Sequence, residues 1–498
     1  MHHEEYFFNM LTEEERERLP LLETFPELLE RAKEVYGTKP AIADDEHALN
    51  YIELYENVGK RIQLLDSLGI PAKAHVAILS RNNVDAMCWL LAVPSSDRVV
   101  MMLPNMLTAE GLKAIVERYD IDALVVEKCF SSLAEGLSVH LIDAADTGET
   151  AAPMAKVEKD TVAAIYLTGG TSGKSKGVVL SHGALMRGTK NGAYRPKGYA
   201  FTRSTILMLP LSHIFGTITS FLTSIFTGTE VHGCNDVKSG IMSIPRIRPT
   251  HLVLVPGIVE IIFNIAKMKG AEFLGDIAAI QCGGAPVSKK LVTEAKGYGI
   301  DLYPGYGLTE GANLTSANAS TEEKPFSVGM VYPEQEYKIV DGELWIRGDN
   351  VMVGYYKDPE ATSEVLTEDG WLKTADLVSI DDDGFLHITG RKDNLIILSN
   401  GENVSPEEVE GAFYQSDLIQ DCLVKKGKAN EQEVLEIEIL PVPGILQKYG
   451  LEESDRLIRD EVKKINDTLP SFKQVSKITI RTEDFKRTGS LKIDRRNS

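Results

Sequence analysis

Short apolar runs alternate with amphipathic segments along the first two thirds of the chain. VAILSRNN, ALVVEK, STILMLPL, THLVLVP and AAIQCGG are brief and rich in branched residues, which predicts strands. Between such runs, AEGLKAIVERY and SKKLVTEAKGYG carry apolar residues at helical spacing. Strands that alternate with helices indicate an α/β architecture, so we expect layered α/β subdomains here.

The pattern changes after about residue 330. YKIVDGELWIRG and GWLKTADLVSIDDDGFLHITG are short strand patterns divided by Gly and Asp turns, which predicts a small β-rich subdomain over about 330–390, with Asp376 at a strand end. After Pro406 the pattern predicts helix, strand, strand, helix and strand, a compact α+β unit. We therefore expect an N-terminal domain over residues 1–390 and a small, mobile C-terminal domain over 391–498.

Composition narrows the class of partner. The chain has 498 residues, with 53 Lys and Arg against 73 Asp and Glu, a formal net charge of −20. Such an acidic balance argues against nucleic acid or an anionic membrane surface as a partner. The five cysteines show no CxxC spacing, which predicts reduced thiols in a cytoplasmic protein without a zinc site. We see neither a signal peptide nor an apolar run near the roughly 18 residues of a membrane span.

The stretch YLTGGTSGKSKG, residues 166–177, carries the densest candidate chemistry. A Walker A loop needs a glycine five positions before Gly173, where the chain has Thr168. The flanking segments TVAAIYL and GVVLSH both predict strands, and a helix pattern begins only near Gly183. We therefore expect a loop between two strands whose backbone N–H groups, hydroxyls and lysines surround a phosphate.

Other stretches are weaker on their own. LYPGYGLTEGAN has the spacing G-x-G-x-x-x-G, which is wrong for a dinucleotide fold, but Thr309 beside Glu310 suits a Mg²⁺ on a phosphate. His213 in LPLSHIFGT is either a catalytic base or a core histidine. The adjacent serine has no G-x-S-x-G context, so a hydrolase triad has no support. DDDG at 381–384 is a hairpin turn, and by pattern alone KRTGSLKIDRR is a basic tail that frays in solvent.

In this order, the stretches resemble the acyl-adenylate-forming (AMP-binding) enzymes. That superfamily includes acyl- and aryl-CoA synthetases, long-chain-fatty-acid–CoA ligases, adenylation domains of peptide synthetases and beetle luciferases. The resemblance covers about residues 50–496. Its motifs are YLTGGTSGKSKG, YGLTE, GELWIRGDNVMVGYY, TADLVSIDDDGFLHITGRKDNLI, NGENVSPEEVE and KRTGSLKIDRR.

The resemblance implies roles for individual residues. Catalytic roles fall to Lys492, Thr309, Glu310 and His213, and Mg²⁺ binding to Thr168 and Glu310. The implied ATP- and AMP-binding residues are Thr168, Gly169, Gly170, Thr171, Ser172, Gly173, Lys176, Gly284, Ala285, Pro286, Tyr306, Gly307, Thr309, Asp376 and Arg391. Asp393 would be the hinge, Gly401, Glu402 and Asn403 would line the thiol tunnel, and His213, Thr217, Pro256 and Gly257 would line the acyl pocket.

Two departures from the family pattern bear on these roles. Ala375 stands where many members have glycine before the ribose-binding aspartate, an exchange that is tolerable unless φ is positive there. Leu491 replaces the glycine that usually precedes the adenylating lysine, so Lys486 is the alternative to Lys492.

The function implied is that of an ATP-dependent acid–thiol ligase. It would use ATP, Mg²⁺ and coenzyme A, or the phosphopantetheine of an acyl carrier protein. LPLSHIFG lacks the aspartate of amino-acid-activating members, which favours a fatty or aromatic carboxylic acid. A luciferase-like oxygenase and a non-catalytic nucleotide-binding regulator remain as alternatives.

Overall fold

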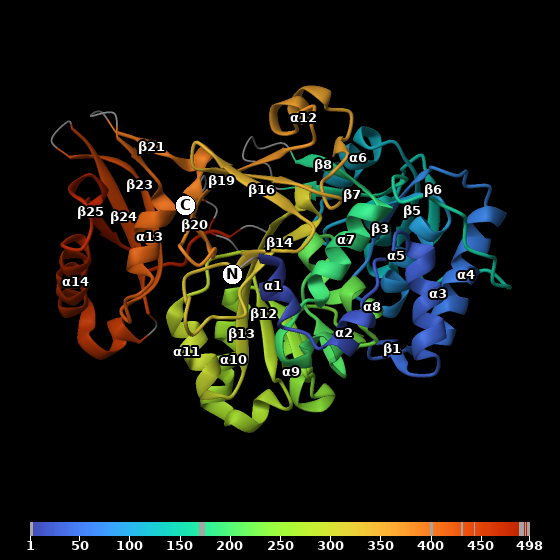
Figure 1. Ribbon diagram of the computed structural model, residues 1–498, viewed down its shortest axis with the longest axis horizontal. Helices are drawn as coiled ribbons and strands as arrows, with labels where there is room; N and C mark the ends of the chain where they lie inside the picture. The colour runs from blue at the N-terminus through green and yellow to red at the C-terminus, as the bar shows by residue number, and fades with distance from the viewer. Residues whose placement is uncertain are drawn as a thin grey trace.

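The computed structural model describes residues 3–168, 175–398, 402–429, 432–442 and 444–487, together with residues 493 and 495. Seven predicted site residues lie outside these ranges: Gly169, Gly170, Thr171, Ser172, Gly173, Gly401 and Lys492. Figure 1 shows a large body that runs from blue to orange, with the C-terminal part of the chain, in deep orange and red, at one end. None of the helices in the described part of the chain combines the length and apolar character needed to cross a bilayer.

A seven-stranded sheet carries the glycine-rich stretch at one side. Its order is β18-β8-β7-β4-β3-β5-β6. Five strands run parallel, namely β3 (His75–Leu79), β4 (Val99–Met102), β5 (Ile121–Val126), β6 (His140–Asp143) and β7 (Val162–Thr168). Strand β8 (Lys176–Ser181) is antiparallel to β7, and β18 (Gly354–Tyr355) is antiparallel to β8. The predicted pair of strands around the glycine-rich loop is confirmed.

The helices of this region are α1 (His3–Phe8), α2 (Glu13–Glu17), α3 (Phe25–Tyr36), α4 (Tyr51–Ser67), α5 (Val84–Ser95), α6 (Ala109–Arg118), α7 (His182–Ala193) and α8 (Thr223–Thr227). A π-helical turn, Gly216–Leu222, leads directly into α8. Nearly all of α5 is buried, which explains its continuous apolar sequence.

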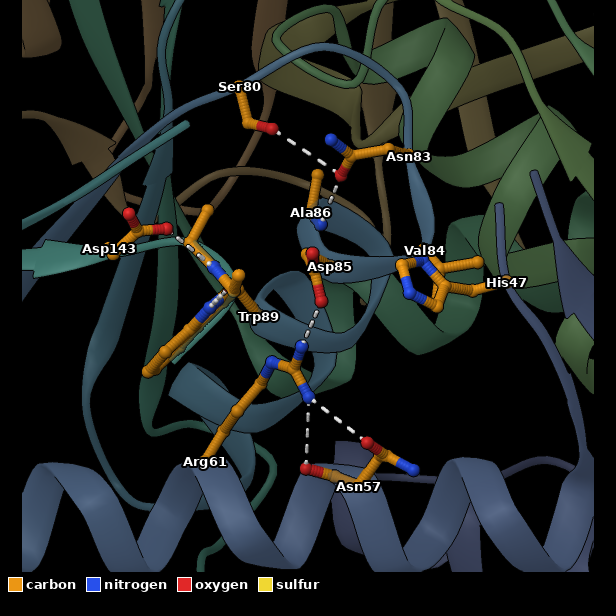
Figure 2. Close-up of polar contacts among 12 residues, drawn as sticks. His47, Asn57, Arg61, Ser80, Asn83, Val84, Asp85, Ala86, Trp89 and Asp143 are labelled. Atoms are coloured by element: carbon orange, nitrogen blue, oxygen red, sulfur yellow. Dashed lines mark hydrogen bonds and ion pairs between the residues drawn. The ribbon is translucent and has the colours of Figure 1, made fainter. Parts of the chain in front are cut away.

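An ion pair between a buried arginine and a half-buried aspartate joins α4 to α5. Arg61 is only 1% exposed, and its Nη2 donates to Asp85 Oδ1 at 2.5 Å (Figure 2). The guanidinium also lies 5.6 Å from the centre of the Trp89 ring. Burial raises the pKa of Asp85, an effect that the Arg61 charge opposes. At the start of α5, Asn83 accepts a hydrogen bond from the Ala86 N–H at 2.8 Å and caps the helix. The cluster thus fixes α5 against α4.

Two further sheets lie beside the first. One has the order β2-β1-β10-β9, from β1 (Pro40–Ala43), β2 (Ala48–Asn50), β9 (Ser204–Leu207) and β10 (Glu230–Gly233). The other has the order β11-β12-β13-β14-β15, from β11 (His251–Leu254), β12 (Ala279–Cys282), β13 (Asp301–Leu308), β14 (Asn313–Ala317) and β15 (Met330–Val331). Helices α9 (Val237–Ile247), α10 (Pro256–Lys269) and α11 (Lys289–Gly297) accompany them. The predicted strand STILMLPL is shorter than expected, because the chain turns before Pro210, which has no N–H to donate.

The β-rich segment forms an antiparallel sheet of order β16-β17-β19-β20. Its strands are β16 (Glu336–Val340), β17 (Glu343–Arg347), β19 (Leu372–Ile380) and β20 (Leu386–Arg391), with α12 (Pro359–Val365) beside them. The predicted DDDG turn joins β19 to β20 and is held by Lys324, whose Nζ pairs with Asp381 at 2.9 Å and with Asp383 at 2.5 Å. Asp376 lies inside β19 and not at a strand end as expected, since the strand continues to Ile380 after a register shift at Leu377/Val378.

The last part of the chain follows the predicted order of elements. A short pair, β21 (Ile396–Ile397) and β22 (Asn403–Val404), precedes α13 (Pro406–Phe413), β23 (Ile419–Ala429), β24 (Gln432–Pro441), α14 (Ile445–Asn466) and β25 (Val475–Ile480). Strand β24 pairs antiparallel with β23 and parallel with β25. Apolar side chains of these elements form a core of their own. The predicted α/β class, with a large first domain and a smaller last one, is confirmed.

Candidate active site

The ends of β7 and β8 fix the two sides of the glycine-rich loop. Thr168, the last residue of β7, pairs in register with Lys176, the first of β8. The Ser175 hydroxyl donates to the Thr168 carbonyl at 2.8 Å, and the Thr168 hydroxyl donates to the Lys176 carbonyl at 3.5 Å. The loop therefore connects antiparallel strands, unlike a Walker loop, which runs from a strand into a helix.

Lys176 and Glu310 meet at one tyrosine. Tyr355 lies on β18, which pairs with β8 through Tyr355 and Val178. The Lys176 Nζ lies 4.6 Å from the centre of the Tyr355 ring, and the Tyr355 hydroxyl donates to Glu310 Oε1 at 2.8 Å. The structure thus brings together a phosphate-binding candidate and a metal-binding candidate that are 134 positions apart, since 310 − 176 = 134. Sequence reasoning missed Tyr355.

A tight turn holds Glu310 at the end of β13. Residues Thr309–Gly311 form a 3₁₀ turn, and the next two residues, Ala312 and Asn313, have φ of 44° and 78°. Left-handed backbone at non-glycine residues is strained and persists only where the surroundings enforce it. Here the Met352 N–H donates to the Glu310 carbonyl at 2.8 Å. The turn therefore presents the Glu310 carboxylate from a fixed backbone.

A second group joins β13 to the β-rich sheet. The Tyr306 hydroxyl donates to Asp376 Oδ2 at 2.5 Å, and Arg391 Nε lies 3.6 Å from Asp376 Oδ1. Asp376 and Arg391 are register partners on β19 and β20. Burial, together with the Asp376 charge, raises the pKa of Tyr306 well above its ordinary value. The predicted ribose-binding pair therefore lies against Tyr306.

Ala375, directly before Asp376, has φ of +59°. Its N–H donates to Glu343 Oε1 at 2.9 Å, and the Asp376 N–H donates to the Thr374 hydroxyl at 3.1 Å. Because φ is positive here, alanine is strained at this position and glycine would be less costly.

Two segments of the predicted ATP- and AMP-binding residues lie at the ends of strands, one directly after β12 and one in the last residues of β13. Residues 283–286 follow β12, and Gly284 has φ of +80°, which favours glycine. A Cβ at Gly307 would lie 1.3 Å from the Asn313 carbonyl oxygen, so no side chain fits there.

The predicted acyl-pocket residues come from two places. His213 is exposed, which excludes the core-histidine alternative. Thr217 is 1% exposed, and its hydroxyl accepts from Tyr166 at 2.9 Å and donates to the Leu211 carbonyl at 2.7 Å. Its hydroxyl is thus used within the protein. Pro256 and Gly257 begin α10, and a Cβ at Gly257 would meet nothing within 4 Å.

The predicted hinge, Asp393, is exposed in a 3₁₀ turn, Lys392–Asn394, between β20 and β21. Its Oδ2 lies 3.9 Å from Arg391 Nη2. In the predicted thiol tunnel, Glu402 and Asn403 are exposed at the start of β22. Lys486, the alternative to Lys492, is exposed near the end of the described chain.

The donor set fits nucleotide and Mg²⁺ as ligands. Within the ranges the structure describes, no cluster of three or more His, Cys, Asp or Glu side chains could hold a metal by itself. Mg²⁺ in nucleotide sites is held by one or two carboxylates together with substrate phosphates, which suits Glu310 with Thr168. Next to Asp376, Arg391 Nε is buried without a hydrogen-bond acceptor, so a donor remains for a bound ribose.

One cavity of the described chain lies away from these residues. It has a volume of about 420 Å³ and is lined by residues that include Leu22, Asp160, Arg187 and Met352. None of the predicted site residues lines it. We therefore place the site by the chemistry of its side chains and not by cavity size.

Comparison with known proteins identifies the family of the chain. A family described as AMP-binding enzyme matches residues 29–356, and one described as AMP-binding enzyme C-terminal domain matches residues 393–498. The chain is 30% identical over 470 residues to 4-coumarate--CoA ligase-like 4 of Oryza sativa subsp. japonica, covering 85% of this chain and 83% of that protein. It is 27% identical over 475 residues to peroxisomal OPC-8:0-CoA ligase 1 of Arabidopsis thaliana, covering 86% and 84%. An anthranilate CoA ligase, AuaEII, crystallised with anthranoyl-AMP, has a similar fold with a TM-score of 0.86 at 19% identity, covering 96% of this chain and 97% of that one.

Proposed function

The chain belongs to the AMP-binding enzyme family, and from this premise we propose that it activates a fatty or aromatic carboxylic acid with ATP and transfers the acyl group to coenzyme A. The family expected from the motifs is confirmed, and the chain is an adenylate-forming enzyme of the CoA ligase group. The observation that carries the proposal is the convergence of Lys176 and Glu310 on Tyr355. In the same chain, Tyr306, Asp376 and Arg391 contact one another, and we propose that they bind the ribose.

In the first half-reaction, a carboxylate oxygen of the acid forms a bond to the α-phosphorus of ATP. The bond from that phosphorus to the bridging oxygen breaks, and pyrophosphate leaves. Asp376 and Arg391 would bind the ribose, and Lys176 would bind the terminal phosphates. Mg²⁺, held by Glu310 and Thr168, would neutralise charge on the leaving group. Lys492 would bind between the acid and the α-phosphate, where two anions must meet.

In the second half-reaction, the thiol of coenzyme A forms a carbon–sulfur bond to the acyl carbon. The bond from that carbon to the phosphate oxygen breaks, AMP leaves, and the thiol proton passes to solvent. Rotation of residues 391–498 about Asp393 would move Lys492 out of the active site and bring the strand near Asn403 into it. One site could then serve both half-reactions. The exposure of Asp393 between two strands is compatible with such a hinge.

Acid choice is proposed from the segment around His213. That segment has no carboxylate to pair with an amino-acid ammonium, and the His213 side chain within it is exposed. The names of the relatives, a coumarate-type and an OPC-8:0 ligase, are consistent with aromatic or fatty acids. All five cysteines are free thiols, and we propose a reducing compartment such as the cytoplasm.

Acid-dependent release of pyrophosphate tests the proposal. The purified chain would be given ATP, Mg²⁺ and one acid at a time, from fatty acids of graded length and substituted aromatic acids, with and without coenzyme A. We expect one class to release pyrophosphate and coenzyme A to convert the product to a thioester plus AMP. Lys492→Ala should abolish the release, while Lys486→Ala, the matched control, should not.

Other outcomes point to the alternatives. Pyrophosphate without thioester formation from coenzyme A would favour a carrier protein as acceptor. Light emission with oxygen would favour an oxygenase. ATP binding without pyrophosphate release from any acid would favour a non-catalytic regulator.

A further inference from the structure

We propose that Tyr355 is a positioning residue of the MgATP site: its hydroxyl fixes the Glu310 carboxylate toward Mg²⁺ while its ring fixes the Lys176 ammonium. This inference rests on the proposed function. Tyr355 has none of the roles predicted from the sequence. In this inference its hydroxyl holds Glu310 and its aromatic ring holds Lys176.

The backbone of Tyr355 is held on both sides. The Val353 N–H donates to the Val179 carbonyl at 2.9 Å, and the Tyr356 N–H donates to the Gly177 carbonyl at 2.8 Å. The Tyr355 N–H itself donates to the Thr362 hydroxyl at 2.9 Å. A side chain mounted on this short strand therefore keeps a fixed position relative to β8, whose first residue is Lys176.

The Glu310 end is equally constrained. Glu310 is carried on the 3₁₀ turn after β13, and its carbonyl accepts from Met352, three positions before Tyr355. The carboxylate then accepts the Tyr355 hydroxyl at 2.8 Å. The same short segment thus holds both the backbone and the side chain of Glu310, and one carboxylate oxygen remains for a metal ion.

The electrostatics suit a permanent donor. A tyrosine hydroxyl carries its proton at neutral pH, so the Tyr355 hydroxyl donates to the Glu310 carboxylate without neutralising it. The lysine, at 4.6 Å from the ring centre, is attracted to the face of the ring by a cation–π interaction.

Tyr356 provides a matched control. It is the next residue of the chain, and its hydroxyl also donates to a carboxylate, that of Asp120, at 2.6 Å. Asp120 lies between α6 and β5, and neither residue belongs to the predicted site. Tyr356→Phe therefore removes a comparable hydrogen bond one position away from the proposed positioning residue.

Calorimetric binding of ATP with Mg²⁺, and of ATP with EDTA, separates the two roles. Loss of a hydrogen bond to a charged group should weaken MgATP binding by Tyr355→Phe about tenfold. Metal-free ATP binding should stay unchanged, since the ring still holds Lys176. Tyr355→Leu should weaken both. Tyr356→Phe should match the wild type, and thermal midpoints of Tyr355→Phe and the wild type should agree.

A double-mutant cycle makes the test specific. In a Glu310→Gln background, Tyr355→Phe should cost clearly less MgATP affinity than in the wild type, because the glutamine oxygen accepts the hydroxyl without a charge. Equal losses with and without Mg²⁺, or wild-type MgATP affinity in Tyr355→Phe, would overturn the proposal.

The binding assay also separates this inference from the proposed function. A wild type that binds MgATP but releases no pyrophosphate contradicts only the proposed ligase activity, and the variants still decide the role of Tyr355. A wild type that does not bind MgATP overturns both.

Discussion

His182 begins α7, directly after the strand that carries Lys176, and its imidazole is 0% exposed. Its Nδ1 accepts a hydrogen bond from the Phe25 N–H at 3.3 Å, at the start of α3, and its Nε2 has no hydrogen-bond partner. Burial lowers its pKa from 6.5 to about 4; Asp97 opposes the shift and Lys73 reinforces it. Protonation would place a charge in this environment and would remove the acceptor that Phe25 uses.

The sign and size of the effect follow from the two pKa values. Between pH 6.5 and 4 the unfolded chain binds the proton and the folded chain does not, so stability falls as the pH falls. A difference of about 2.5 units corresponds to roughly 3 kcal/mol of unfolding free energy at most, of which about 1.8 kcal/mol is lost between pH 7 and pH 5.

Urea unfolding at several pH values, followed by tryptophan fluorescence, measures this loss. His182→Gln keeps a neutral acceptor at any pH and should show a shallower decline than the wild type, by about 1.8 kcal/mol between pH 7 and 5. His47→Gln is the matched control, because His47 is exposed; it should follow the wild-type curve. Identical pH slopes for His182→Gln and the wild type would refute the reasoning.

Three further predictions come from the site. Ala375→Gly relieves the left-handed alanine and should raise the unfolding free energy by about 1 kcal/mol in urea titrations; an unchanged or lower value would contradict the strain. Gly307→Ala places a Cβ within 1.3 Å of the Asn313 carbonyl oxygen and should lower the unfolding free energy by about 3 kcal/mol. Gly257→Ala, whose Cβ would meet nothing within 4 Å, should leave the unfolding free energy unchanged. Equal effects of the two substitutions would contradict the packing argument. Asp376→Asn should weaken AMP binding about ten- to a hundredfold in calorimetry, since it removes a charged acceptor, and wild-type affinity would argue against ribose binding there.

The sequence predicted the secondary-structure elements and their order along the chain best. Glycine-rich and β-branched patterns predicted the two strands around residues 169–174, the hairpin turn at 381–384 and the order of elements after Pro406, and the structure confirms each. These features depend on local periodicity and turn chemistry, which a single sequence carries.

Tertiary details were not accessible in the same way. The local sequence Gly-Tyr-Tyr at residues 354–356 gives no sign that the Tyr355 hydroxyl contacts Glu310. That contact forms because β18 pairs with the edge of a sheet whose other strands come much earlier in the chain. The left-handed φ of Ala375 also goes against the preference of alanine and is set by bonds to neighbouring strands. The burial of His182 likewise depends on α3 packing over the start of α7.

Oxygen transfer tests the central claim most directly. The acid that supports pyrophosphate release would be labelled with ¹⁸O in its carboxylate. The mass of the AMP formed in the complete reaction with coenzyme A would then be measured by mass spectrometry. If the carboxylate attacks the α-phosphorus, each AMP should carry one ¹⁸O from the acid. AMP without the label would contradict an acyl-adenylate and, with it, the function proposed for this site.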